Sequence, residues 1–98
     1  MNTIALYETD LTNYMTIQQW LKQSLQFPEW YGENLDALYD MLTGWLPLPL
    51  TIVWYATENP QLNNDSSTDL QHQLLLCREV FAEAATDTDS LLIFEYRP

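Results

Sequence analysis

The segment from Phe27 to Trp45 combines carboxylates with aromatic rings and contains no lysine or arginine. Its acids are Glu29, Glu33, Asp36 and Asp40, and its aromatic residues are Phe27, Trp30, Tyr31, Tyr39 and Trp45. Carboxylates supply charge-assisted hydrogen bonds, and aromatic rings supply rigid contact area that loses little rotamer entropy on binding. The segment therefore predicts a surface that holds a cationic partner.

We expect a helix between Asn34 and Gly44. Asn34 is a favourable N-cap, and Gly44 suits the left-handed residue that follows many helices. At 100° per residue, this helix has an apolar arc and a polar arc. The apolar arc holds Leu35, Leu38 and Leu42, with Tyr39 and Met41 at its edges, and the polar arc holds Asp36, Asp40 and Thr43.

Asp36 and Asp40 lie four residues apart on the polar arc. A like-charge pair at this spacing costs about 0.2–0.5 kcal/mol of helix stability. Asp36 regains part of this cost from the helix dipole, whereas Asp40 meets a dipole of its own sign near the other end. A helix selected only for stability would more readily carry lysine at position 40. A solvated acidic face without a partner is the alternative interpretation.

Two tryptophans flank this helix. Trp30 lies in the loop that Gly32 marks, and loop aromatics on a rigid scaffold are frequent recognition anchors. Trp45 follows the helix directly. Trp20 and Trp54 are expected in the core, because they belong to a predicted helix and a predicted strand.

Length and composition predict one soluble, cytoplasmic domain that spans residues 1–98. The chain has 98 residues, of which 47% are hydrophobic, which is ordinary for a globular domain. No apolar run approaches the ~18 residues of a membrane-spanning helix, and no signal segment is evident. Cys77 is the single cysteine, so an internal disulfide is excluded, as is usual in a reducing compartment.

The net charge limits the classes of partner. Fourteen acidic residues stand against three basic ones (Lys22, Arg78 and Arg97), which gives a net charge of −11. Such a chain repels nucleic acids and anionic membranes. A basic protein partner and a simple solubility effect both remain, and the acidic and aromatic segment favours the partner.

The predicted elements follow the order strand, helix, helix, strand, helix, strand. The strands are expected at Thr3–Tyr7, Leu50–Ala56 and Leu91–Tyr96. The second is almost continuously apolar, which indicates a strand buried on both faces. Helices between strands favour parallel pairing with right-handed crossovers. We therefore expect an α/β fold with a three-stranded parallel sheet packed by three or four helices.

Two further helices complete this prediction. The first is expected to begin with Asp10, Thr12 or Asn13 as its cap, to bury Tyr14, Ile17, Leu21 and Leu25, and to end at Pro28. The other is expected to begin at Thr68, paired with Gln71 in a capping box, and to bury Leu70, Leu74, Cys77, Phe81 and Ala84. The polar segment Asn59–Ser67 is expected to connect it to the preceding strand.

Catalysis and cofactor binding have little support in the sequence. His72 is expected on the surface and Cys77 in the core. No histidine or cysteine cluster has metal-ligand spacing, and two glycines are too few for a phosphate-binding loop. Asp87 and Asp89 are explained by a solvated turn. We therefore expect no cofactor and no metal.

The stretch Pro28–Trp45 resembles the signature region of the barstars, intracellular protein inhibitors of barnase-type ribonucleases. The similarity is closest in YGENLDAL (Tyr31–Leu38) and LTGW (Leu42–Trp45), and it continues more loosely in Pro49–Trp54 and Val80–Ala84. The resemblance implies that the acidic helix and its preceding loop plug a microbial ribonuclease. In this family, carboxylates occupy the position of the substrate phosphate and pair with the enzyme's arginines and catalytic histidine.

The resemblance also implies individual roles. Asp40 would be the central carboxylate in the phosphate site, Asp36 would meet a flanking arginine, and Trp30 stands where the family has a tyrosine that packs on the enzyme's histidine. The implied partner-binding patch further includes Tyr31, Gly32, Asn34, Tyr39, Thr43, Gly44 and Trp45, with Glu83 as a peripheral acid. The bond between Leu48 and Pro49 is expected to be cis. Glu8 and Glu58, taken as strand-edge and loop residues away from the motif, are expected to be neutral for binding.

Several residues depart from the family pattern. Tyr39 replaces a tryptophan, Trp30 replaces the tyrosine, and Ala82 and Ala85 stand where relatives often carry basic residues. The expected partner is therefore a basic barnase-like ribonuclease or a related ribonuclease toxin domain. We expect a 1:1 heterodimer and a chain that is monomeric when free.

We thus predict a ribonuclease inhibitor or immunity protein that mimics RNA phosphates and has no catalytic activity of its own. Two other classes remain open. One is an acidic, metal-assisted hydrolase that uses Asp36, Asp40 and a neighbouring glutamate, which tight stoichiometric metal binding would support. The other is a nucleic-acid mimic that sequesters basic DNA-binding proteins, which several partners of modest affinity would support.

Overall fold

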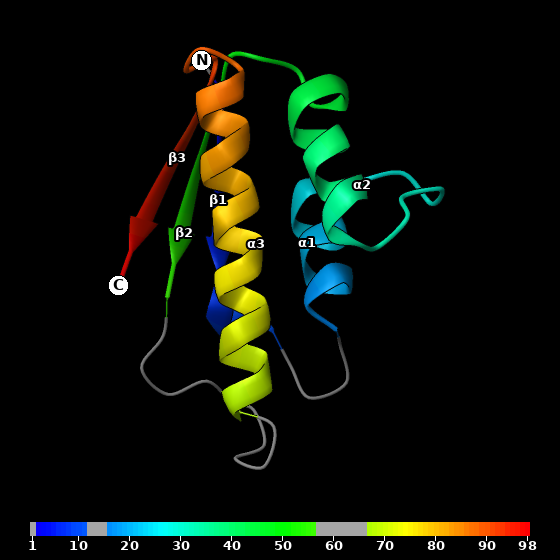
Figure 1. Cartoon of the computed structure of the whole chain (residues 1–98), viewed down its shortest axis with the longest axis vertical. Helices are drawn as coiled ribbons and strands as arrows, with labels where there is room; N and C mark the ends of the chain where they lie inside the picture. The colour runs from blue at the N-terminus through cyan, green and yellow to red at the C-terminus, as the bar shows by residue number, and fades with distance from the viewer. Residues whose placement is uncertain (1, 12–15, 57–66) are drawn as a thin grey trace.

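The computed structural model describes residues 2–11, 16–56 and 67–98, with side chains from residue 71 onward in the last range. Three parallel strands form one sheet in the order β1-β2-β3, namely β1 (Asn2–Tyr7), β2 (Leu50–Tyr55) and β3 (Leu92–Arg97) (Figure 1). The three-stranded parallel sheet is confirmed, and each strand bound lies within one residue of its predicted position.

Strand β2 is the centre of the sheet. Its register pairs Ile52 with Ile4 of β1 and with Phe94 of β3. Ile52, Val53 and Trp54 point alternately to the two faces of the sheet and are all buried. The prediction of a strand buried on both faces is therefore confirmed. The peptide bond between Leu48 and Pro49, just before β2, is cis, as the resemblance implied.

The helices lie together beside and in front of the sheet (Figure 1). They are α1 (Ile17–Leu25), α2 (Leu35–Asp40), which continues directly into the π-helical turn η2 (Met41–Trp45), and α3 (Ser67–Asp87). A short 3-10 turn, η1 (Glu8–Asp10), follows β1. No helix within the described ranges is long and apolar enough to cross a membrane.

Helix α1 begins later than predicted. Its N-cap is Thr16, whose hydroxyl accepts a hydrogen bond from the Gln19 amide at 3.1 Å, while the Gln19 side chain accepts one from the Thr16 amide at 3.0 Å. This is a capping box, and its Thr16–Gln19 spacing is present in the sequence. Asp10 is not the cap because it belongs to η1, and positions 12–14 lie outside the described residues.

The other helix ends also differ in detail. Helix α1 stops at Leu25, since Gln26 has a left-handed backbone with φ of 56°, two residues before Pro28. Helix α3 begins at Ser67, so Thr68 lies inside the helix and does not precede it. The predicted stripe is buried at Leu74, Cys77, Phe81 and Ala84. The side chain of residue 70 and the predicted connection at 59–66 lie outside the described part.

The core is built around aromatic rings. Trp20 and Trp54 meet edge to face with ring centroids 5.1 Å apart, and Phe81 approaches Trp54 in the same manner at 5.8 Å. Both tryptophans are fully buried, which confirms their predicted core positions. Cys77 is also buried, and its burial raises the pKa of its thiol to about 11. The thiol is therefore uncharged at neutral pH.

Glu8, expected at a strand edge, is a buried carboxylate in the η1 turn directly after β1. Its side chain is 5% exposed and accepts a hydrogen bond from Trp54 Nε1. Arg78 lies 3.8 Å from the carboxylate, and its guanidinium stacks 4.6 Å from the centre of the Tyr96 ring. A buried indole N–H needs an acceptor, and Glu8 provides it. Glu8 therefore lies buried in η1 and not at a strand edge, and its expected neutrality for binding stays a prediction.

We predict that Glu8→Ala lowers the free energy of unfolding by about 1–3 kcal/mol, because it leaves the buried Trp54 N–H without this acceptor. Urea denaturation followed by far-ultraviolet circular dichroism measures the change. Glu8→Gln keeps an acceptor oxygen and should recover part of the loss. Asp10→Ala, at an exposed acid of the same turn, is the control and should change stability by less than about 0.5 kcal/mol. Equal effects of the two alanine variants would contradict this role of Glu8.

Candidate functional site

The loop before α2 is tied to the helix by Asn34. Its Oδ1 accepts a hydrogen bond from the Ala37 amide at 2.7 Å, and its Nδ2 donates to the Gly32 carbonyl at 3.2 Å. Asn34 is thus the N-cap that the sequence predicted. A side chain on Gly32 would bring its Cβ to 3.3 Å from that of Ala37, closer than most such contacts. The absence of a side chain at position 32 therefore lets the loop fold tightly onto α2.

The apolar arc of this helix faces the core, as predicted. Leu38, Met41 and Leu42 are buried, and α2 packs against α3. The opposite arc consequently faces solvent, and both Asp36 and Asp40 are exposed. Thr43, predicted on the same arc, is only partly exposed, and its hydroxyl donates to the Tyr39 carbonyl at 2.9 Å.

Gly44 does not end the helix. The Leu46 amide donates to the Met41 carbonyl at 2.9 Å, which closes a π-helical turn over Met41–Trp45. No glycine in the described residues has a positive φ, so the predicted left-handed conformation of Gly44 is wrong. Gly44 is exposed, and the space around it is open. The π-helical turn thus extends past Gly44, the predicted end of the helix, and Trp45 is its last residue.

The predicted acids of two distant segments meet in one hollow, which we call the acidic groove. Its volume is about 320 Å³ and it lies between α2 and α3. The groove is lined by Leu35, Asp36, Tyr39 and Asp40 of α2 and by Val80 and Glu83 of α3. The structure therefore places Glu83 beside Asp36 and Asp40 in one groove. In the sequence, only the family resemblance linked Glu83 to these two residues.

The carboxylates of the acidic groove form no ion pair with any described residue of the chain. Within the described part of the chain, ion pairs join Arg78 to Glu8 and Arg97 to Glu95, and neither pair involves the groove. Both arginines of the chain are thus engaged elsewhere. Three acids without a cation create a negative potential that favours a cationic group from another molecule.

The two tryptophans predicted beside the helix are accessible. Trp30 is 68% exposed in its loop, which agrees with the prediction that it lies outside the core. Trp45 is 42% exposed, and its ring meets Phe27 edge to face with centroids 6.0 Å apart. Most of the surface of Trp30 is thus exposed, whereas Trp45 packs against the buried Phe27.

Tyr31 differs from the other residues of the predicted patch because it is only 3% exposed. Its ring packs on Phe27, with centroids 4.6 Å apart, and its hydroxyl donates to Gln18. This burial raises the pKa of Tyr31. Tyr31 therefore supports the loop from inside and presents little surface to a partner.

Asp87 is a residue of this site that the sequence analysis assigned to a solvated turn. It is the last residue of α3, and its Oδ2 accepts a hydrogen bond from the Tyr39 hydroxyl at 2.5 Å. This bond raises the pKa of Tyr39, and burial and the charges of Asp87, Glu83 and Asp40 act in the same direction. One feature of the sequence could have indicated this contact: Tyr39 stands where the family has a tryptophan. Unlike tryptophan, tyrosine has a hydroxyl group that can donate a hydrogen bond to Asp87.

The residues considered for other chemistry lie apart. His72 is exposed on α3, as predicted, and Asp89 lies in the turn after α3 with φ of 54°. In the described ranges, no three histidine, cysteine, aspartate or glutamate side chains form a group that could hold a metal ion.

Comparisons with known proteins agree with this geometry. Residues 1–95 match the sequence model of the family described as "Barstar (barnase inhibitor)". A protein of Bacillus subtilis (strain 168), "Putative ribonuclease inhibitor YrdF", is 49% identical over 53 residues, which cover 54% of this chain. The same alignment covers 58% of that protein, so this chain spans less than two thirds of its relative's length.

We predict that Asp87→Asn lowers the pKa of Tyr39 toward the ordinary value of about 10, because it removes a negative charge beside the hydroxyl. Because the pKa of Tyr39 is higher in the folded state than in the unfolded state, the bond to Asp87 stabilises the fold fully below about pH 10. This stabilisation is lost as the pH rises through the pKa that Tyr39 has in the folded state. The parent should therefore lose more stability than the variant in this alkaline range. Carbon-13 resonances of the tyrosine rings, assigned with Tyr39→Phe, report the titration.

The control for this titration is Asp10→Asn, since Asp10 follows the end of β1 and Asp87 precedes the start of the parallel strand β3. The two acids thus lie at opposite ends of the sheet, and Asp10→Asn should leave the titration of Tyr39 unchanged. An unchanged titration in Asp87→Asn as well would show that the negative charge of Asp87 does not control the pKa of Tyr39.

Proposed function

The chain belongs to the barstar family of barnase inhibitors, and we propose that it inhibits a basic ribonuclease by filling the enzyme's phosphate-binding site with the carboxylates of the acidic groove. The observation that carries this proposal is the convergence of Asp36, Asp40 and Glu83 on one hollow, where they pair with no cation among the described residues. A ribonuclease must hold a phosphate with cationic groups, and the same groups bind a carboxylate.

Each groove residue has a role in the proposed complex. Asp40 is the central carboxylate, as the family resemblance implies, and it lines the groove as the last residue of α2. Asp36 meets a second arginine one helical turn away, and Glu83 meets a cation from the opposite wall. Tyr39 forms part of the floor, and its bond to Asp87 at 2.5 Å fixes the ring.

Exposed aromatic residues extend the proposed contact beyond the groove. Trp30, at 68% exposure, offers a large ring in the loop and would pack on the enzyme's catalytic histidine. Trp45, Gly44, Thr43, Asn34 and Gly32 would border the same contact. Tyr31 acts from inside by holding the loop against Phe27. We further propose that one inhibitor binds one enzyme, since a single helix and loop supply the contact.

The partner is defined by its chemistry. A net charge of −11 and three groove acids require a basic enzyme, either barnase-like or a related toxin domain. The chain, used as bait in a pull-down, should recover one basic protein that cleaves RNA, and the added chain should stop that cleavage. Several unrelated DNA-binding proteins of modest affinity, with no ribonuclease among them, would instead support the nucleic-acid mimic.

We predict that Asp40→Ala weakens inhibition most, followed by Asp36→Ala and Trp30→Ala, and then by Glu83→Ala. Loss of an enclosed carboxylate leaves the enzyme's arginines buried and unpaired, at a cost of about 2–5 kcal/mol, a range whose best-studied example is the barnase–barstar complex itself. Glu83 is exposed and partly solvated, so its loss should cost on the order of 1 kcal/mol. Inhibition constants for RNA cleavage measure the order.

The control for this series is Asp10→Ala, an exposed acid away from the groove. Asp10 is a better control than Glu8, because Glu8 makes a buried hydrogen bond that its removal would break. It is also a better control than Glu58, because Glu58 lies outside the described residues. Circular dichroism must first show that each variant is folded. If Asp40→Ala inhibits as strongly as the parent, phosphate mimicry by this helix is wrong and the acids form a solvated surface only.

We also predict that the association rate falls steeply as salt rises from low to physiological ionic strength, while the dissociation rate changes less. Attraction between this chain and a basic enzyme should accelerate encounter about a hundredfold at low salt, and screening removes that gain; steering of this kind is best known from barnase and barstar themselves. Stopped-flow fluorescence of the tryptophans measures both rates. An association rate that does not depend on salt would mean that the acidity serves solubility.

A further inference from the structure

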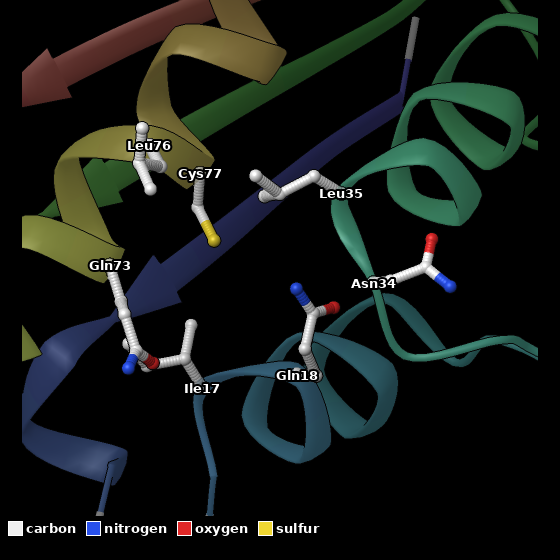
Figure 2. Close-up of a pocket in the computed structure, with 7 residues that line it drawn as sticks. All are labelled: Ile17, Gln18, Asn34, Leu35, Gln73, Leu76 and Cys77. Carbon is white, nitrogen blue, oxygen red and sulfur yellow. The ribbon is translucent and has the colours of Figure 1, made fainter.

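A second hollow lies on the other side of Leu35 from the acidic groove, and we call it the amide pocket. Its volume is about 260 Å³. It is lined by Ile17 and Gln18 of α1, by Asn34 and Leu35 at the start of α2, and by Gln73, Leu76 and Cys77 of α3 (Figure 2). Three helices that are separate in the sequence thus form one concave site.

The described residues that line the amide pocket include no charged one, although the chain carries fourteen acids. Apolar side chains form its walls, with Leu35 and the sulfur of Cys77 pointing into the space (Figure 2). Burial keeps the Cys77 thiol protonated at neutral pH. An ionised ligand would therefore lose its hydration without a partner of opposite charge, whereas an uncharged ligand would not.

Gln18 supplies a polar group with a defined direction. Its Oε1 accepts the hydrogen bond from the Tyr31 hydroxyl, which fixes the orientation of the amide. Its Nε2 points toward Cys77 and Leu35, into the pocket (Figure 2). Among the described residues, this nitrogen has no hydrogen-bond acceptor, and the side chain is partly buried. The nitrogen is open to solvent in the free chain, so a ligand that covers it must supply an acceptor such as a carbonyl oxygen or leave the donor unpaired.

We propose that the amide pocket binds an uncharged small molecule with an apolar body about the size of one ring and a carbonyl group that accepts a hydrogen bond from Gln18 Nε2. The volume exceeds that of engineered cavities of about 150 Å³ that hold benzene. The walls contact the body of the ligand, and Gln18 orients its polar edge, which is the usual division of roles in small-molecule sites.

The position of the amide pocket connects it to the acidic groove. Leu35 lines both hollows, and Asn34, which caps α2, lies at the edge of the pocket. A bound ligand would therefore contact the first turn of the helix that carries Asp36 and Asp40. This connection follows from the shared residues and does not depend on the proposed inhibition of a ribonuclease.

Titration of the nitrogen-15-labelled chain with benzamide, benzoate and toluene tests the proposal. Benzamide should shift the amide signals of Gln18, Leu35 and Cys77 saturably, with a dissociation constant of about 1 mM, as is typical of so small a ligand. Toluene, which lacks the acceptor, should bind about fivefold more weakly, and benzoate should cause no saturable shift. Equal binding of benzamide and benzoate, or shifts confined to other residues, would overturn the proposal.

Two variants with one matched control localise the binding. Gln73→Trp places a ring at the exposed edge of the pocket and should abolish benzamide binding, whereas Gln71→Trp, on an exposed position of the same helix outside the lining, should not. Gln18→Glu keeps an acceptor for Tyr31 but removes the donor, so it should weaken benzamide about fivefold and leave toluene unchanged. Undiminished benzamide binding in Gln73→Trp would place the ligand elsewhere and refute the site.

Discussion

The burial of Leu38 and Leu42 holds the acidic helix in place, and the site depends on it. The α-helical part of α2 has six residues, which is too short to be stable alone in water. Its Asp36 and Asp40 oppose helix formation by about 0.2–0.5 kcal/mol. Each buried leucine contributes about 1.5–3 kcal/mol, several times that cost. Packing against the core thus permits a charge pattern that the helix by itself would not favour.

The main features of the fold could be predicted because local patterns and packing agree. The apolar run at Leu50–Tyr55 is a central strand, and the leucines of α2 face the core as their spacing indicated. The end of α2 could not be predicted in the same way. Gly44 favours a left-handed residue in general, but here the turn widens to a π-helical one that ends at Trp45. Tertiary packing decides whether the helix ends with a left-handed Gly44 or with a π-helical turn at Trp45, and no single residue type indicates which of the two occurs.

The positions of Glu8 and Asp87 mark a second limit of sequence analysis. Each carboxylate appears in the sequence as an ordinary surface acid, and each receives a hydrogen bond from an aromatic residue of a distant element. Glu8 pairs with Trp54 through the core, and Asp87 pairs with Tyr39 at the groove. A single sequence does not show which acid meets which donor when the partners lie more than forty positions apart. The family resemblance supplied the candidate Glu83 but not these two contacts.

Leu35 divides two hollows of opposite character. On one side, acids without counter-ions attract cations, and on the other side a lining without charge excludes ions of either sign. The two hollows therefore select different ligands although they share one side chain. Because Leu35 belongs to the first turn of α2, a displacement of this residue acts on the turn that Asn34 caps and that carries Asp36. Two segments line both hollows, the first turn of α2 and helix α3, and Leu35 is the side chain that the two linings share.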